Sequence, residues 1–158
     1  MTNFVKSLIA LVALTGLALP AAAQEQPISL AGDVMMVKTE TNAAGESTTK
    51  LVEPKTIVPG DRLIFGTDYS NSGSDAVENF VVTNPLPAPV RLASDADPEL
   101  SVSVDGGKKW GKLADLTVAS DAGEARAAAH ADVTHVRWVL SVVAPGAKGR
   151  LEYPAIIR

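Results

Sequence analysis

Short runs in which apolar and polar residues alternate recur along the chain, separated by turns that contain glycine or proline. In the clearest run, "DVTHVRWVL", Val136, Trp138 and Leu140 alternate with His135 and Arg137. Because successive side chains of a β-strand point to opposite faces, we expect the three apolar side chains in the core and the other two at the solvent face. Apolar residues at helical spacing are nearly absent. The pattern predicts an all-β fold, either an antiparallel sandwich or a barrel.

The beginning of the chain follows the three-part pattern of a secretory signal peptide. Lys6 precedes an uncharged apolar run over residues 7–19, and alanines at 21–23 supply the small residues of a cleavage site. The run is shorter than the roughly 20 residues that span a bilayer. We therefore predict a signal peptide at residues 1–23, a single domain at residues 24–158 and no membrane span after cleavage. The mature protein is expected in the periplasm, outside the cell or at its surface.

The composition excludes several classes of function. The chain has no cysteine and a formal net charge of −4. Without cysteine it has neither thiol nucleophiles nor cysteine metal sites, and no disulfide supports the fold. Nucleic-acid binding depends on Lys and Arg side chains that neutralise phosphates, so we do not expect nucleic acid to be a partner.

The segment "VPGDRLIFGTDYSNSG" predicts a strand between two turns. Pro59 and Gly60 form the first turn, where the Asp61 carboxylate is suited to accept hydrogen bonds from backbone amides. Asn71 and Gly73 end the strand, since both residue types tolerate the left-handed region of positive φ. We predict a structural role for all five residues.

These motifs carry a family resemblance. Over residues 58–87 the chain runs through Pro-Gly-Asp, an aliphatic-aromatic strand, Asn-x-Gly, an alternating strand and "PLP". The residues that match the family pattern are Pro59, Gly60, Asp61, Tyr69, Asn71, Gly73 and Pro87. This segment resembles the conserved-repeat domain family known as domain of unknown function eleven, here in a single copy. The resemblance implies an immunoglobulin-like β-sandwich on an exported or cell-surface bacterial protein, and it implies no catalytic residues.

The stretch "SVDGGKKW", at residues 103–110, has the spacing of the Asp box of sialidase-type propellers. In such a box the aspartate accepts hydrogen bonds from turn amides, the glycine permits the bend and the tryptophan packs beneath it. A propeller requires about four blades of four strands, which a chain of this length with one box does not supply. We therefore predict a structural hairpin framed by Asp105, Gly107 and Trp110.

Candidate metal and catalytic groups are few. Asp95, Asp97 and Glu99 place carboxylates at alternate positions, as calcium loops do, but the segment lacks the glycine and further ligands of an EF-hand. The alternative is a solvated acidic loop. His130 and His135 have a spacing that fits no common zinc pattern. No serine–histidine–aspartate relay is visible, so we predict no catalytic residues, no cofactor and no enzymatic activity.

Two functional interpretations remain. The first is an exported, non-enzymatic module with a structural or protein-interaction role in the cell envelope, whose partner is a protein or an envelope polymer. The alternative is a carbohydrate- or calcium-binding accessory module that uses residues 95–110, where Trp110 and neighbouring lysines form a cationic-aromatic patch. The alanine-rich segment at residues 121–132 is predicted to be a loop with one helical turn.

Overall fold

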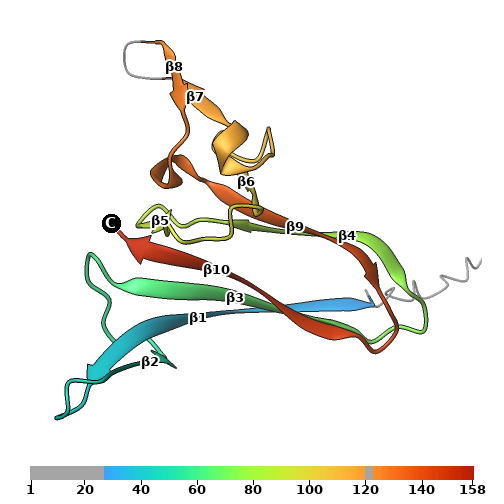
Figure 1. Cartoon of the computed structure of the whole chain (residues 1–158). Helices are drawn as coiled ribbons and strands as arrows, with labels where there is room; N and C mark the ends of the chain where they lie inside the picture. The colour runs from blue at the N-terminus through green and yellow to red at the C-terminus, as the bar shows by residue number, and fades with distance from the viewer. Residues whose placement is uncertain (1–26, 120–122) are drawn as a thin grey trace, which may run out of the picture.

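The computed structural model describes residues 27–119 and 123–158 and shows an all-β chain with antiparallel sheets (Figure 1). This confirms the all-β prediction. The predicted signal peptide at residues 1–23 lies outside the described residues. Within the described part, no helix has the length and apolar character needed to cross a membrane.

The described residues form strands and two short 3-10 helices (η1 and η2). Their bounds are β1 (Ile28–Thr41), β2 (Ser47–Val52), β3 (Arg62–Asn71), β4 (Val77–Pro85), β5 (Val90–Leu92), β6 (Ser101–Ser103), η1 (Leu113–Asp115), β7 (Thr117–Ala119), β8 (Ala125–Ala127), η2 (His130–Asp132), β9 (His135–Val143) and β10 (Lys148–Ile157).

Two sheets face each other in a sandwich-like arrangement, and a small third sheet stands apart from them (Figure 1). The larger sheet has the strand order β2-β1-β3-β10-β5, and the sheet opposite has the order β4-β9-β6. The third sheet pairs β7 with β8. Side chains of both large sheets meet between them in one apolar cluster.

The core forms where β9 and β10 face each other. Val136 of β9 and Ala155 of β10 are fully buried, and Tyr153 is 1% exposed. The Tyr153 ring stacks on Phe65 with ring centres 5.0 Å apart, and Trp138 of β9 contacts the same tyrosine at 6.2 Å. The burial of Val136 and the inward position of Trp138 confirm the predicted facing of this strand.

Prolines mark the point at which the chain crosses between the two large sheets. β4 ends at Pro85 in one sheet, and β5 begins at Val90 in the other. Between them the Val90 amide donates a hydrogen bond to the Pro87 carbonyl at 3.0 Å. Proline cannot donate to a sheet ladder, so the segment leaves one sheet here.

The Pro-Gly-Asp turn forms as predicted. Gly60 has a φ of +94°, and the Asp61 carboxylate accepts a hydrogen bond from the Val58 amide at 2.8 Å. The prediction of positive φ at Asn71 and Gly73 is wrong, because neither residue lies in the left-handed region. Asn71 acts through its side chain instead.

Asn71 joins the two large sheets through its buried side-chain amide. Its Nδ2 donates to the carbonyls of Val143, at 2.9 Å, and Asp75, at 2.8 Å. Its Oδ1 accepts a hydrogen bond from the Gly73 amide at 2.9 Å. A Cβ atom at position 73 would lie 2.6 Å from the Cβ atom of Pro27, so the close approach of the Pro27 ring, rather than φ, requires this glycine.

The alanine-rich segment is more regular than predicted. Ala125, Arg126 and Ala127 pair with β7, and a single 3-10 turn follows as η2. Residues 120–122, between β7 and β8, lie outside the described residues. Arg126 forms paired hydrogen bonds to the Asp132 carboxylate, both at 2.7 Å, which connects the hairpin to η2.

Candidate functional site

The loop "SVDGGKKW" is held by a network centred on Asp105. One carboxylate oxygen of Asp105 accepts hydrogen bonds from the amides of Lys108, at 3.0 Å, and Lys109, at 2.9 Å. The Lys109 amide, followed by the Ser103 hydroxyl, holds the pKa of Asp105 below its ordinary value. Gly107 has the predicted positive φ, +86°. These contacts agree with the structural role predicted for the loop.

Ser103 completes this network, and the sequence reasoning missed it. Its hydroxyl oxygen accepts a hydrogen bond from the Gly107 amide at 2.9 Å, and the hydroxyl lies 2.8 Å from the Asp105 carboxylate. Ser103 is fully buried although it points away from the apolar core, because the loop folds over it. The Ser-x-Asp spacing was the available signal, since a hydroxyl two residues before an aspartate is placed to bond within the same turn.

Trp110 lies against the outward face of β9. Its Nε1 donates to the Gly107 carbonyl at 2.9 Å. The Arg137 guanidinium lies 4.4 Å from the ring centre, and His135 meets the ring edge-on at 6.2 Å. Arg137 and His135 therefore face away from the core as predicted, but His135 is half-buried beneath the tryptophan rather than solvated. One face of Trp110 is occupied by arginine and is closed to a sugar ring.

The three candidate calcium ligands have separate partners. The Asp95 carboxylate pairs with Arg62 through two hydrogen bonds of 2.8 Å. The Asp97 carboxylate accepts a hydrogen bond from the backbone amide of Glu99 at 2.9 Å. The Glu99 carboxylate forms a salt bridge with Lys112 at 2.6 Å. Among the described residues, no group of three or more histidines and carboxylates is placed to hold a metal ion. The loop contacts do not favour the calcium interpretation.

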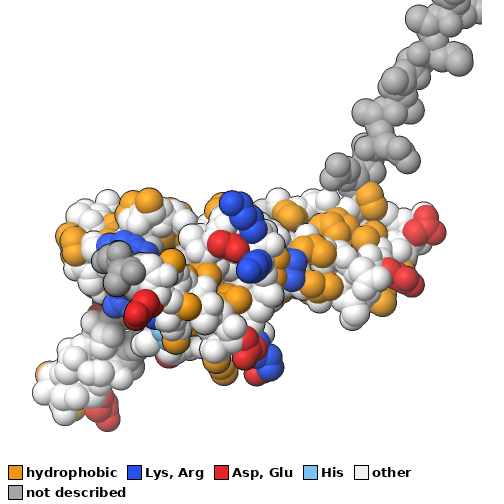
Figure 2. All heavy atoms as spheres, turned by 90° about the horizontal axis from the view of Figure 1, so that it is seen from above, with side chains coloured by type: hydrophobic (Ala, Val, Ile, Leu, Met, Phe, Trp, Pro, Cys, Tyr) orange, Lys and Arg blue, Asp and Glu red, His pale blue; other side chains and the backbone are white. Residues whose placement is uncertain are grey.

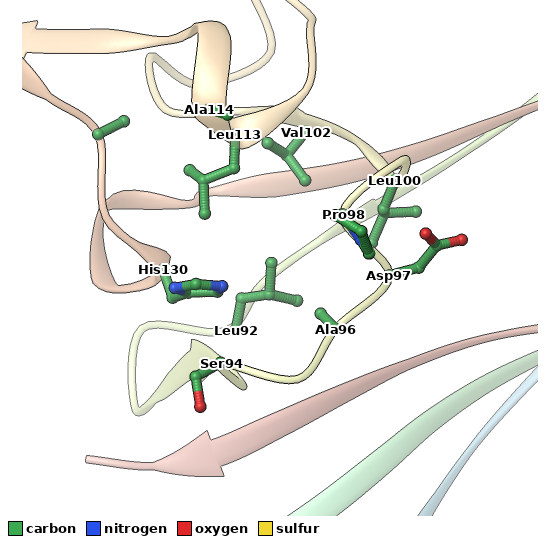
Figure 3. A pocket seen from close by; sticks show the side chains of 11 residues that line it. Leu92, Ser94, Ala96, Asp97, Pro98, Leu100, Val102, Leu113, Ala114 and His130 are labelled. Carbon is green, nitrogen blue, oxygen red and sulfur yellow. The ribbon is translucent and has the colours of Figure 1, made fainter.

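An apolar pocket of about 350 Å³ lies between the segment after β5, β6 and the two 3-10 helices (Figure 3). The labelled side chains of Leu92, Val102 and Leu113 converge on it. The Asp97 carboxylate and the Ser94 hydroxyl are turned away from it in this view. The pocket therefore offers an apolar surface and the ring of His130, which does not amount to a set of catalytic groups.

The edge of the larger sheet is open along half of β1. Strand β2 pairs with β1 only from Met36 to Thr41, whereas β3 pairs with β1 from Ile28 to Met36. None of the described strands pairs with residues 28–35 on the β2 side. These residues contain neither lysine nor proline, the residue types that commonly protect sheet edges. The open edge of β1 is accordingly a surface competent for strand pairing.

The single charge along this edge is balanced. The Asp33 carboxylate forms two hydrogen bonds with Arg150, at 2.7 and 3.0 Å, and Arg150 also contacts Asp68 at 3.1 Å. Arg150 lowers the pKa of Asp33 chiefly through these side-chain hydrogen bonds. The space-filling view likewise shows acidic and basic side chains interspersed with hydrophobic ones rather than gathered in a field of one sign (Figure 2).

Comparisons with protein-family models, with curated proteins and with solved structures found no match to the chain. The resemblance of residues 58–87 to a conserved-repeat domain family therefore stays a prediction. The turn at Asp61 and the corner at Asn71, which carry that resemblance, make the structural contacts described above.

Proposed function

We propose that the chain is an exported, non-enzymatic β-sandwich module of immunoglobulin-like type, with a protein-interaction role in the cell envelope. The open edge of β1 carries this proposal. A strand edge of this length that is not protected by lysine, proline or a bulge favours pairing with another chain. The N-terminal signal-peptide pattern supports export.

The hydrogen bonds of the neighbouring strand define which backbone groups point to this edge. The backbone amide of Ser72 donates to the Pro27 carbonyl, on the β1 side of β3. The backbone amide of Asn71 donates to the Ala147 carbonyl, on the opposite side of β3. In an antiparallel ladder, residues with inward and outward backbone groups alternate. The register of β1 and β3 is continuous from residue 28 to residue 36. The N–H and C=O groups of Leu30, Gly32 and Val34 therefore point to the open edge.

Such an edge binds an extended segment by main-chain hydrogen bonds, in the manner of β-augmentation. β1 is fixed along its other side by β3, so the edge is formed before any partner arrives. A preformed edge reduces the entropy cost of binding, because only the partner segment must be ordered.

Amide hydrogen exchange provides the test. The labelled protein is mixed with proteins extracted from the envelope of the cells that produce it, and exchange is followed at Leu30, Gly32 and Val34. We expect protection of these three amides by the intact extract and none after the extract has been digested with protease. Unchanged exchange in the intact extract would show that the edge is not a protein-binding surface.

The export part of the proposal is tested separately by the intact mass of the protein recovered from those cells. Cleavage after Ala23 should give a chain that begins at Gln24. A recovered protein that retains Met1 contradicts export through a cleaved signal peptide, whatever the exchange experiment gives.

A further inference from the structure

The first half of β1 has no neighbour on one side among the described strands (Figure 1). β2 occupies this side of β1 only from Met36 onward. Ile28, at the start of β1, lies opposite Asn71, whose backbone amide donates to Ala147 on the far side of β3. The backbone groups of Ile28 therefore point to the open edge, as do those of every second residue after it. The residues with free edge groups are Ile28, Leu30, Gly32 and Val34.

This set of four residues is symmetric about Ala31. Reversing the strand about Ala31 exchanges Ile28 with Val34. It likewise exchanges Leu30 with Gly32. Two identical strands that pair antiparallel have this symmetry, with a two-fold axis at the centre of the pair. Each of the four residues then faces a residue that also directs its N–H and C=O groups across the edge, and the ladder ends before the part of β1 that β2 occupies.

We propose that the occupant of the open edge is a second copy of this chain, paired antiparallel with β1 and with Ala31 of both copies at the two-fold axis. The inference rests on the proposed function and names the partner in that interaction. Because the axis is perpendicular to the sheet, the inward faces of the two larger sheets lie on the same side of one continuous sheet.

The side chains on the inward face fit this register. Leu30, which is 49% exposed, lies opposite Gly32 of the second copy. A Cβ atom at Gly32 would meet only a backbone oxygen of β3, at 3.8 Å, so the space over this glycine is open to the leucine. Ile28 of the second copy lies opposite Val34, where an apolar groove of about 460 Å³, lined also by Ile57, reaches β1. Both apolar side chains are therefore covered by the pairing.

On the outer face the pairing brings a hydrogen-bond donor to an acceptor. Ser29 of each copy lies opposite Asp33 of the other, in a pair without main-chain hydrogen bonds, where side chains approach most closely. The Ser29 hydroxyl lies 2.8 Å from the Ser70 hydroxyl, from which it can accept while it donates to the Asp33 carboxylate. That carboxylate is held by Arg150 and has lone pairs left for a further donor.

The charge of Asp33 favours the same register over its neighbours. With Ala31 at the axis, the two Asp33 residues lie four positions apart along the paired strands, about 14 Å. An axis at Gly32 brings them to diagonal positions about 7–8 Å apart and leaves Ile28 without a partner. An axis at Asp33 places the two carboxylates directly opposite each other, which destabilises a strand pair.

A single cysteine at the axis tests this register. The chain has no cysteine, so Ala31→Cys introduces its only thiol. The Cα atoms of the two copies at position 31 are then about 4.5 Å apart, a separation that a disulfide spans. Oxidation in a glutathione buffer should convert this variant into a covalent dimer.

Ser29→Cys is the matched control, because position 29 is exposed on the same face of β1. It places the two thiols about 14 Å apart, too far for a disulfide. This variant should therefore remain monomeric on a denaturing gel. Equal cross-linking of the two variants, or no cross-linking of Ala31→Cys, overturns the proposed pairing.

Self-association is measured on the mature protein alone. Sedimentation should show a monomer–dimer equilibrium, and the four edge amides should exchange at least about tenfold more slowly in the dimer than in the monomer. Leu30→Pro removes an edge-directed N–H and should stay monomeric at every concentration. Thr49→Pro, which removes an N–H on the outer side of β2, should dimerise as the native protein does. A reversed result for the two proline variants would move the interface to β2 and overturn the inference.

Two envelope extracts separate this inference from the proposed function. An extract of the producing cells contains unlabelled copies of the protein, whereas an extract of cells without its gene does not. At a concentration at which the labelled protein alone is monomeric, the first extract should protect the edge amides and the second should not. Protection by the second extract would identify a different protein as the occupant, so that the interaction role stands and the inference falls. No protection by either extract, together with no self-association, overturns both.

Discussion

The guanidinium group of Arg137 lies 4.4 Å from the centre of the Trp110 ring, on the face of β9 that is directed away from the core. The Nε atom of Arg137 is buried and has no hydrogen-bond partner in the described structure. The electron-rich face of the indole therefore lies against a guanidinium group that is half-buried, and a cation–π contact of this kind is stabilising.

Replacing Trp110 should destabilise the fold through this contact. Trp110→Ala removes both the ring face and apolar cover, and we expect a loss of about 2 kcal/mol in the free energy of unfolding. Trp110→Phe keeps a ring face and loses the Nε1 hydrogen bond to Gly107, for a loss of about 1 kcal/mol. Urea unfolding measures both. Equal losses would show that the contact with Arg137 contributes nothing.

Asn71 should be among the most sensitive polar positions. Asn71→Ala leaves the buried Val143 carbonyl and the Gly73 amide without their partner, and three hydrogen bonds of about 1 kcal/mol each are lost. We expect a loss of about 3 kcal/mol by chemical denaturation. The neighbouring exposed Ser72→Ala serves as the control and should cost less than about 0.5 kcal/mol. Comparable losses would contradict the cross-sheet role.

Acid should destabilise the protein partly through Asp132. Hydrogen bonds from Arg126, and secondarily from the Ala129 amide, lower the pKa of Asp132 to about 2. Because the folded pKa lies below the unfolded one, the stabilisation is complete above about pH 4 and is lost as pH falls toward 2. Unfolding free energies from pH 6 to pH 2 should therefore fall less steeply in Asp132→Asn than in the native protein. Parallel curves would disprove the assignment.

The ladder direction along β1 predicts an asymmetry between neighbouring proline substitutions. Leu30→Pro removes an N–H that points to the open edge, so the melting temperature should change little. Ala31→Pro removes an N–H directed to β3 and should cost at least about 1 kcal/mol. Thermal unfolding of the two variants measures the difference. A larger loss of stability in Leu30→Pro than in Ala31→Pro would show that the N–H of Leu30 points to β3, and that Leu30, Gly32 and Val34 do not present their amides at the open edge.

The parts of this structure that could be predicted from the sequence depend on short-range contacts. Asp61 and Asp105 bond to amides three or four positions away, so residue type and spacing were sufficient. Alternation likewise predicted the inward face of β9, because it reflects a single strand. Asn71 was predicted to end its strand, which it does, but its cross-sheet contact was not predicted, since its partner Val143 is 72 positions away and no local pattern reveals that contact.

The open edge of β1 was equally inaccessible to sequence reasoning. It arises because β1 has 14 residues and its partner β2 has 6, which leaves part of β1 without a neighbour. Strand lengths of this kind are set by which segments meet across the sheet, and alternation within one segment carries no information about its neighbours. The cover of Arg137 by Trp110 depends in the same way on a loop that folds back over another strand.

The position of β10 has a consequence for how the protein acquires its structure. β10 lies between β3 and β5 in the larger sheet, and its Arg150 contacts Asp68, 82 positions earlier in the chain. Until β10 has left the ribosome, β5 has no strand to pair with and β3 lacks one of its two neighbours. The five-stranded sheet is consequently completed only after β10 has been synthesised, and its completion joins distant segments, which slows folding. Before that point the nascent chain can form the β2-β1-β3 part of the sheet, but β5 cannot join it.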